Sequence, residues 1–350
     1  MKAALITDTH FGVRSGNQLF LDNQKMFYEK IFFPTLEKEN IKVVLHLGDI
    51  FDQRKQINLD VWYQTKEMFF DVLKENDIEF HAISGNHDVY YKNTNRVNGL
   101  DLLLREYDNV HVNTKYPKHL KIGDTDFLMV PWITDDNREK CLNEINNSDA
   151  DVVLGHFDIQ GFQMRKGTVS DHGLDRNIFK KYHAVYSGHY HHGNSSGNVE
   201  YLGAPSEYDW SDSGCNRGFH IFDCTSMTKR FIINPYKMHI DIEYDQDIDE
   251  SDLENIEIPE GSFIRIKAGS VENPHILENL VDKLSEKNSV AVTTKKLSED
   301  VKNFDIEENA SFEEIIEEYL KFSLNDDIYE KYSDVIKKKL NELQGKALKI

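Results

Sequence analysis

Five short polar segments, each placed directly after an apolar run, constrain this 350-residue chain more than any other feature. The segments are Asp8-Thr9-His10, Gly48-Asp49, Gly85-Asn86-His87-Asp88, Gly155-His156 and Gly188-His189-Tyr190-His191. Short apolar runs bounded by turn residues are typical of buried strands. In open α/β sheets the carboxyl ends of the strands meet at one edge, where ligands bind. The sequence therefore predicts that five strand ends deliver their polar side chains to one rim.

The residue types in these segments indicate a dinuclear metal site. The candidate ligands are two carboxylates, one amide and four histidines: Asp8, Asp49, Asn86, His10, His156, His189 and His191. Carboxylate and amide oxygens favour Mn²⁺, and imidazole also admits iron, zinc or nickel. A carboxylate such as Asp49 can bridge two cations about 3.5–4 Å apart. The alternative is that these residues are ordinary polar residues of turns, which does not explain five such segments in succession.

Other histidines fit structural roles better. His46, His81 and His183 lie in or beside predicted strands and are interpreted as core or edge residues. Because side chains alternate along a strand, His192 would point away from the face of His191, towards solvent or behind the ligands. His172, in the loop 170–173, is a further candidate for lining the site, against the alternative of an ordinary loop residue.

The apolar pattern predicts an α/β body over residues 1–240. Strands are expected at 3–7, 41–47 and 78–83, with helices at 17–39 and 59–76 between them. Such alternation favours a parallel sheet with helices on its faces. After residue 110, short strands recur with one helix at 135–147. That pattern favours a mixed sheet or two sheets packed face to face.

The remainder of the chain is predicted to form two smaller parts. An acidic linker over 241–260 precedes a strand at 263–268, a helix at 274–287 and a strand at 290–294. This order is typical of a small α+β unit. Residues 311–344 are predicted to be helical. The predicted domains are therefore 1–240, 241–300 and 301–350.

Composition excludes several classes of protein. The longest apolar run falls short of the ~18 residues that a membrane span needs, and the first twelve residues do not resemble a signal peptide. Three cysteines without a CxxC pair argue against a disulfide framework and favour a reducing compartment. The net charge is −6 over residues 1–240 and −14 over 241–350. This acidity disfavours contacts with phosphates, unless bound divalent cations reverse the local charge.

The order D-x-H, GD, GNHD, GH and GH-x-H resembles the calcineurin-like metallophosphoesterase superfamily. Within it, Gly48–Asp52, Gly85–Asp88 and the block Tyr201–Ser206 are similar to DNA-repair nucleases of the SbcD type and their shorter relatives in tailed phages. The resemblance covers about residues 1–240 and extends more weakly to the tail. It implies an α/β fold, a two-sheet sandwich flanked by helices, with a small α+β capping domain and a C-terminal helical segment.

The resemblance also implies roles for individual residues. One metal ion would be held by Asp8, His10, Asp49 and His191, and the other by Asp49, Asn86, His156 and His189. The ions would be two Mn²⁺, with Mg²⁺ or another divalent cation as alternatives. His87 would donate a proton to the leaving oxygen, with Asp88 orienting it. Asp52 stands where some relatives carry histidine, which leaves its part in the reaction open.

Three functions are compatible with the sequence. The first is a DNA exonuclease and endonuclease that acts with an SbcC-type ATPase in DNA end processing and recombination. The second is another phosphoesterase, such as a protein phosphatase or a nucleotide phosphodiesterase. Gln53 and Asp88 disfavour the phosphatase, because arginine and glutamate are expected there. The third is an inactive scaffold that binds DNA or an ATPase, which the complete ligand set disfavours.

The expected partners are DNA, the ATPase and a second copy of the chain, without a membrane. Basic residues that follow three of the motifs are candidates for holding phosphates or else ordinary surface: Arg14, Arg54, Lys55, Lys92 and Arg96. The absence of a base-reading motif predicts a preference for DNA structure or ends. Apolar residues of 311–344 would dock on the ATPase or fold back on 241–300. Those of 59–76 and 100–104 would join two copies or only cover the sheet. The expected compartment is the cytoplasm, of the host if the chain is phage-encoded.

Overall fold

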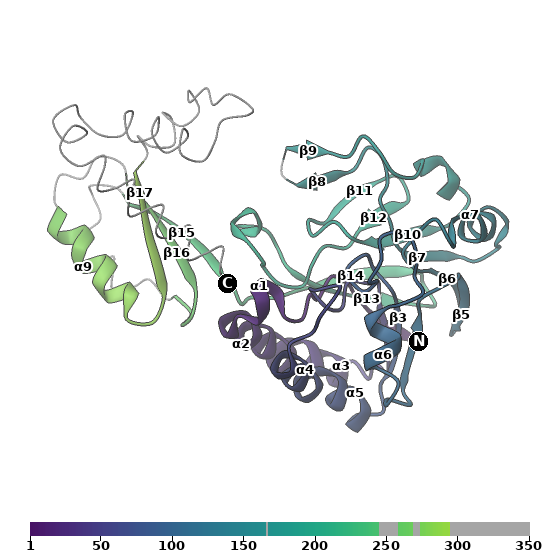
Figure 1. Ribbon diagram of the computed structural model, residues 1–350, viewed down its shortest axis with the longest axis horizontal. Helices are drawn as coiled ribbons and strands as arrows, with labels where there is room; N and C mark the ends of the chain where they lie inside the picture. Colours follow the sequence, from purple (N-terminus) through teal and green to yellow (C-terminus); the bar gives the residue numbers. More distant parts are fainter. Residues whose placement is uncertain (166, 245–257, 269–273, 295–350) are drawn as a thin grey trace. The chain divides into compact units, whose positions relative to one another are not determined.

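The computed structural model describes residues 1–165, 167–244, 258–268 and 274–294 (Figure 1). The helices predicted at 311–344 lie outside these residues. The described part contains two six-stranded sheets, one three-stranded sheet and a two-stranded hairpin. Within it, no helix combines the length and the apolar character needed to cross a lipid bilayer.

The first six-stranded sheet has the order β14-β13-β1-β2-β3-β4. Its strands are β1 (Lys2–Ile6), β2 (Val43–His46), β3 (Glu79–Ile83), β4 (Val110–Asn113), β13 (Gly218–Asp223) and β14 (Thr228–Ile233). Strands β1 to β4 are parallel, and β13 runs antiparallel to β1. The parallel sheet predicted from the alternating pattern is therefore confirmed, with an antiparallel extension at one side.

The second six-stranded sheet has the order β11-β12-β10-β7-β6-β5. Its strands are β5 (Lys118–Ile122), β6 (Thr125–Val130), β7 (Val152–His156), β10 (Ala184–Gly188), β11 (Asn194–Ser196) and β12 (Val199–Tyr201). The hairpin consists of β8 (Gln163–Arg165) and β9 (Thr168–Val169). Strands β6, β7, β10 and β12 are parallel, so the carboxyl ends of β7 and β10 lie at the same edge.

The helices at 18–38, 59–75 and 138–147 follow the predicted positions closely, whereas two short helices, at 13–16 and 99–103, were not predicted. In chain order, these helices are α1 (Val13–Gly16), α2 (Gln18–Phe27), α3 (Phe33–Lys38), α4 (Leu59–Thr65), α5 (Asp71–Glu75), α6 (Gly99–Leu103) and α7 (Arg138–Asn147). A π-helical turn (Tyr28–Phe32) joins α2 to α3, and another (Lys66–Phe70) joins α4 to α5. The side chains of Asn17 and Asn58 accept hydrogen bonds from backbone amides at the starts of α2 and α4, as helix caps do.

Three hydrophobic cores define four layers. Ala4 and Ile6 of β1 pack with α2 to α5, whereas the intervening Ala3 and Leu5 face the second sheet. A third core joins the other face of the second sheet to α7. The two sheets thus lie face to face, with helices on the outer faces, as Figure 1 shows for α2 to α5 and α7. This arrangement confirms the predicted two-sheet sandwich flanked by helices.

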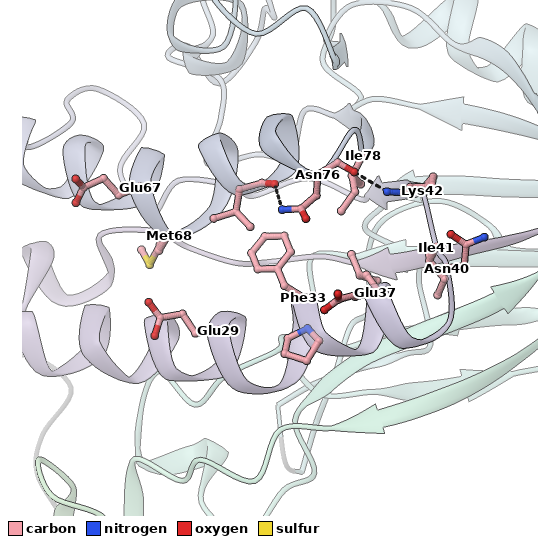
Figure 2. A pocket seen from close by; sticks show the side chains of 13 residues that line it. Glu29, Phe33, Glu37, Asn40, Ile41, Lys42, Glu67, Met68, Asn76 and Ile78 are labelled. Atoms are coloured by element: carbon pink, nitrogen blue, oxygen red, sulfur yellow. Dashed lines mark hydrogen bonds between the residues drawn. The ribbon is translucent and has the colours of Figure 1, made fainter.

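The apolar bulk of 59–76 mostly covers the first sheet. Phe69 and Phe70 are fully buried in the core beneath α4 and α5, whereas Tyr63 is 59% exposed and Leu102 of α6 is 66% exposed. A cavity of about 420 Å³ lies between the helical segment 59–75 and the helical segment that ends with α3 (Figure 2). Phe33 and Met68 line it, and the seven predicted ligands do not. The cavity therefore lies apart from the predicted ligands.

A three-stranded sheet follows the body, in the order β15-β16-β17. It consists of β15 (His239–Tyr244), β16 (Phe263–Ala268) and β17 (Ser289–Thr294), with α9 (Pro274–Ser285) between the last two strands. The predicted strand–helix–strand order is confirmed. The prediction of a linker from residue 241 is wrong for its first four residues, because they belong to β15 and pair with β16. The carboxylates of Asp241 and Glu243 form ion pairs with Arg265 and Lys267 of β16. These pairs stabilise β15 although its composition is acidic.

Candidate metal centre at the seam of the two sheets

The seven predicted ligands come together at one edge of the sandwich. The first sheet contributes Asp8 and His10 after β1, Asp49 after β2 and Asn86 after β3. The second sheet contributes His156 at the end of β7, and His189 and His191 after β10. The first five are at most 8% exposed, and the last two are half-buried. The prediction of one shared rim is confirmed, and the rim spans both sheets.

The first group consists of Asp8, His10 and His191, whose candidate ligand atoms lie within 4.8 Å of one another. The Nε2 atoms of His10 and His191 face each other at 3.1 Å, and His10 Nε2 lies 3.7 Å from Asp49 Oδ2. Asp8 also accepts hydrogen bonds from the backbone amide of His189, which fixes its carboxylate between the two sheets.

The second group consists of Asp49, His156 and His189, again within 4.8 Å, with Asn86 between the two imidazoles. Asn86 Oδ1 lies 3.0 Å from His156 Nε2 and 2.8 Å from His189 Nδ1, and Asp49 Oδ2 lies 3.3 Å from His156 Nε2. Asp49 thus stands between the two groups, as a bridging carboxylate would.

The contacts of His156 test whether these residues suit a cation. Its Nδ1 donates to the carbonyl oxygen of Leu47 at 2.7 Å, so in the neutral imidazole Nε2 carries a lone pair. When Nε2 is deprotonated, its lone pair faces the oxygens of Asn86 and Asp49, so three acceptors converge on one point. A divalent cation at this point would satisfy all three, and the residues therefore fit a metal ion.

The backbone places these side chains by an unusual local conformation. Asp8, His10, Asp49 and His189 have φ values of 51°, 43°, 56° and 92°, in or near the left-handed region. Asp and His tolerate this region better than most residues. A side chain at Gly85 would place its Cβ 2.2 Å from Asp49 Oδ1, so glycine is required for this close approach. The motifs therefore combine polar ligands with residues that permit sharp turns.

Asp88 contacts the backbone of two of the motifs. Its carboxylate accepts hydrogen bonds from the backbone amides of Asp49, Ile50 and Gly85 at 2.8 to 3.1 Å. The carbonyl oxygen of Asp52 lies 2.5 Å from Nδ1 of His87 and orients its imidazole. Asp88 is a buried latch, a carboxylate that joins the backbone of the second and third motifs, and its effect on the orientation of His87 stays a prediction.

Replacing this latch should damage the site although no ligand is changed. In Asp88→Asn, an amide N–H₂ would face backbone donors, and we expect a loss of roughly 2–3 kcal/mol in the free energy of unfolding. Metal affinity should fall by about 10–100-fold, as for other residues that support ligands. Thermal unfolding and manganese titration measure both. Asp101→Asn is the matched control, because Asp101 binds Asn98 and Thr114 away from the ligands. Unchanged manganese affinity in Asp88→Asn would show that the latch is unimportant for the site.

A comparison with known protein families matches residues 1–193 to the family described as calcineurin-like phosphoesterase. This match covers more than half of the chain and contains all seven predicted ligands. The chain belongs to the calcineurin-like phosphoesterase family. The resemblance inferred from the five motifs is therefore confirmed.

Two curated relatives of this calcineurin-like phosphoesterase are parts of nucleases by name. Exonuclease subunit 1 of Enterobacteria phage T4 is 33% identical over 269 residues, which cover 74% of this chain and 76% of the relative. The SbcD component of the SbcCD nuclease of Staphylococcus saprophyticus is 26% identical over 267 residues, covering 66% and 68%. A solved structure of an archaeal phosphodiesterase covers 67% of this chain and 99% of its own, with 16% identity and a TM-score of 0.34. That likeness is too distant to support an inference about this chain.

Burial is the largest influence on the titratable groups of this phosphoesterase site. Together with the charge of His156, it lowers the pKa of His189 to about 3, which leaves a neutral imidazole. Burial also disfavours a charged His156, but the carboxylate of Asp49 outweighs it and raises the pKa of His156 to about 9. Burial would raise the pKa of Asp49, but the charge of His156 lowers it well below its usual value. Without a cation the protein therefore holds a buried Asp49–His156 ion pair, and a bound cation would replace the proton of His156.

Several supporting residues of the phosphoesterase site carry no signal in the sequence. The indole of Trp132 lies against His189 with ring centroids 5.2 Å apart. Tyr208 donates hydrogen bonds to the carbonyl oxygens of Asp8 and Thr9 at 2.7 and 2.8 Å. The carboxylate of Asp52 lies 3.3 Å from His10 Nδ1, which gives a role to a position that the resemblance left open. These contacts depend on tertiary folding, so spacing along the chain does not indicate them.

Four further histidines considered in the sequence analysis lie outside the two ligand groups. His46 is buried, with Nε2 3.1 Å from the hydroxyl of Thr9, and burial lowers its pKa to about 3. His192 contacts Asp212 and Cys215 instead of the ligands. His172 is an exposed partner of Asp158 and Asp171. His183 is exposed at the start of β10. The interpretation of His46 as a core residue is therefore confirmed, and His172 does not join the ligands.

Proposed function

We propose that this chain is a metal-dependent nuclease that hydrolyses DNA phosphodiester bonds as an exonuclease at duplex ends and as an endonuclease. The observation that carries the proposal is the convergence of two ligand groups on Asp49 in a member of a phosphoesterase family. The names of the two curated relatives support DNA as the substrate class. Two Mn²⁺ ions are the proposed cofactor, with Mg²⁺ as the alternative.

In such a reaction, seven of the side chains would bind the metal ions and another would donate a proton. Asp8, His10, Asp49 and His191 would hold one ion, and Asp49, Asn86, His156 and His189 the other. Bound there, the ions would neutralise the phosphodiester and activate a water for in-line attack. The backbone amide of His87 donates a hydrogen bond to Asp49 Oδ1 at 2.7 Å, and its Nδ1 donates one to the carbonyl oxygen of Asp52. With Nδ1–H donating to that carbonyl, the imidazolium form of His87 would carry its transferable proton on Nε2, give it to the leaving oxygen and be left as the neutral imidazole.

The surface next to His87 suits a nucleotide. A cavity of about 170 Å³ is lined by His87 together with Phe51, Tyr90 and Leu102, so it adjoins the proposed acid directly. Tyr90 and its neighbour Tyr91 are 37% and 43% exposed. The ammonium group of Lys55 lies 5.6 Å from the centroid of the Tyr90 ring. Exposed aromatic rings beside a cation are a common platform for unpaired bases and their phosphates.

The direct test is cleavage by the purified chain. We expect Mn²⁺-dependent cleavage of linear duplex DNA, abolished by a chelator, without release of phosphate from phosphopeptides. Preference for phosphopeptides or free cyclic nucleotides would support another phosphoesterase and overturn the nuclease proposal. Binding of DNA without hydrolysis of any phosphoester would support an inactive scaffold.

The exposed ring of Tyr90 gives a prediction about contact with a base of the substrate. Tyr90→Ala should reduce cleavage of DNA by about 10-fold or more, because stacking of one base contributes about 1–3 kcal/mol. Hydrolysis of bis(p-nitrophenyl) phosphate, which has no base to stack, should be unchanged. Tyr63→Ala is the control, since Tyr63 is 59% exposed and lies on α4 outside this cavity. Equal effects of Tyr90→Ala on the two substrates would contradict a role in base contact.

We also propose that residues 301–350 bind an SbcC-type ATPase and that residues 241–300 form a capping domain. The name of the SbcCD relative supports such a partner. The small sheet has a hydrophobic cluster of its own around Ile264, Ile266 and Leu280, which is the support for a capping domain. A homodimer through the exposed parts of α4 and α6 is a further proposal. Sedimentation that shows a monomer at tens of micromolar would remove it.

Deleting residues 305–350 tests the ATPase proposal. The truncated chain should stay folded and retain its manganese-dependent nuclease activity, because all proposed ligands precede residue 192. It should lose co-purification with the ATPase and any stimulation by ATP. An insoluble product would favour packing of this segment on residues 241–300. Undiminished ATPase binding would exclude it as the docking segment.

A further inference from the structure

A second cluster of ligand-type side chains lies on β3 and β4, apart from the proposed catalytic site. Glu79, His81 and His111 each offer one ligand atom, and these atoms lie within 4.8 Å of one another. The two imidazoles stack with centroids 4.7 Å apart and an interplanar angle of 29°. His111 Nε2 lies 2.6 Å from Glu79 Oε2. The proposed function does not use any of these residues.

The strand register explains why these side chains meet. His81 and His111 are direct partners in the parallel pairing of β3 with β4, so their side chains leave neighbouring strands at the same level. Glu79 is two residues before His81 and therefore lies on the same face of β3. Phe80, between them, is buried in the helical core on the opposite face. The backbone thus fixes all three residues on one face.

The chemistry of the cluster suits a transition metal. Two imidazoles and one carboxylate form a common ligand set for Zn²⁺, whose ligand atoms lie roughly 3–4 Å apart around one ion. Burial, followed by the charge of His111, lowers the pKa of His81 to about 4, so that its imidazole is neutral and has a free lone pair. The side chains of Glu79 and His111 are 51% and 50% exposed, which gives an ion access from solvent.

We propose that Glu79, His81 and His111 form a separate binding site for a late first-row divalent cation such as Zn²⁺, completed by water. Such an ion would tie β4, the outermost strand of its sheet, to β3. Its role would be to stabilise the strand pair. This would also steady the motif that contains Asn86, because that motif follows β3 directly. The proposal does not depend on the nuclease activity, since neither histidine belongs to the catalytic groups.

The test is a Zn²⁺ titration of the full chain, monitored by calorimetry, after its metals have been removed with a chelator. We expect His111→Ala and His81→Ala each to lose one equivalent of bound Zn²⁺ and Glu79→Gln to bind it at least 10-fold more weakly. His119→Ala is the matched control, because His119 is an exposed histidine with two carboxylate neighbours, Asp126 and Glu144, but no second imidazole. It should retain that equivalent.

Two results would overturn the proposal. One is unchanged Zn²⁺ stoichiometry and affinity in His111→Ala, a half-exposed position where misfolding is not expected. The other is an equal loss in His119→Ala, which would mean that zinc binds to surface histidines without selection. Cleavage of DNA by His111→Ala is expected to equal that of the wild type. Failure of the nuclease proposal would be seen in the wild type and would leave the zinc titration interpretable.

Discussion

Replacing Asp49 with alanine is expected to abolish phosphodiester cleavage and metal binding together. Asp49 Oδ2 lies 3.3 Å from His156 and 3.7 Å from His10, so one carboxylate would serve both proposed ligand groups. Its other oxygen holds the backbone amide of His87. Loss of one oriented donor typically costs an enzyme about 10²–10³-fold in rate. A shared ligand should cost more, and we expect activity at the level of the uncatalysed control.

Two measurements check this expectation: the rate of DNA cleavage and the manganese content after dialysis. Asp60→Ala is the matched control, because Asp60 is an exposed carboxylate on α4 that contacts Gln64. Asp49→Asn should lose metal in the same way while keeping the shape of the side chain. Wild-type manganese stoichiometry and activity in Asp49→Ala would falsify the assignment of Asp49 as a bridging ligand.

Replacing His87 with alanine should separate proton transfer from metal binding. The variant keeps its backbone contact with Asp49, so both metal ions and DNA should still bind. The rate of cleavage should fall by about 10²–10⁴-fold, the usual contribution of a general acid. Single-turnover kinetics with a saturating enzyme concentration would measure this loss without interference from product release.

The same variant tests a second interpretation of His87. His87, His10 and Asp52 form a group whose ligand atoms also lie within 4.8 Å of one another. If His87 were a ligand, manganese content and rate would fall in parallel. His172→Ala provides the control, because this histidine pairs with Asp158 and Asp171 at an exposed position. A full complement of manganese combined with a wild-type rate would remove His87 from the mechanism.

The position of the site was predictable from the sequence because it depends on strand ends. Apolar runs such as Ala3–Thr7 and Ile41–Leu47 indicate buried strands, and the residue types that follow them indicate metal chemistry. Parallel pairing brings those ends to one edge of each sheet, and the face-to-face packing of the two sheets brings the two edges together. The match of the family model to residues 1–193 confirms the family inferred from these motifs.

The parts that were not predictable depend on contacts between distant segments. Asp88 accepts hydrogen bonds from backbone amides about 38 positions earlier, which spacing alone does not reveal. Strand β15 was missed because its acidic residues suggested a linker, whereas their partners Arg265 and Lys267 become neighbours only after β16 pairs with it. In both cases the deciding interaction is formed by the fold and is invisible in local composition.

The division of the proposed ligands between two sheets has a consequence for synthesis of the chain on the ribosome. Asp8 and Asp49 emerge early, but His189 and His191 follow about 140 residues after Asp49. A nascent chain therefore has only half of the proposed metal site until the second sheet is complete and has closed on the first. The proposed nuclease activity would then begin only after this closure, so an unfinished polypeptide would lack it.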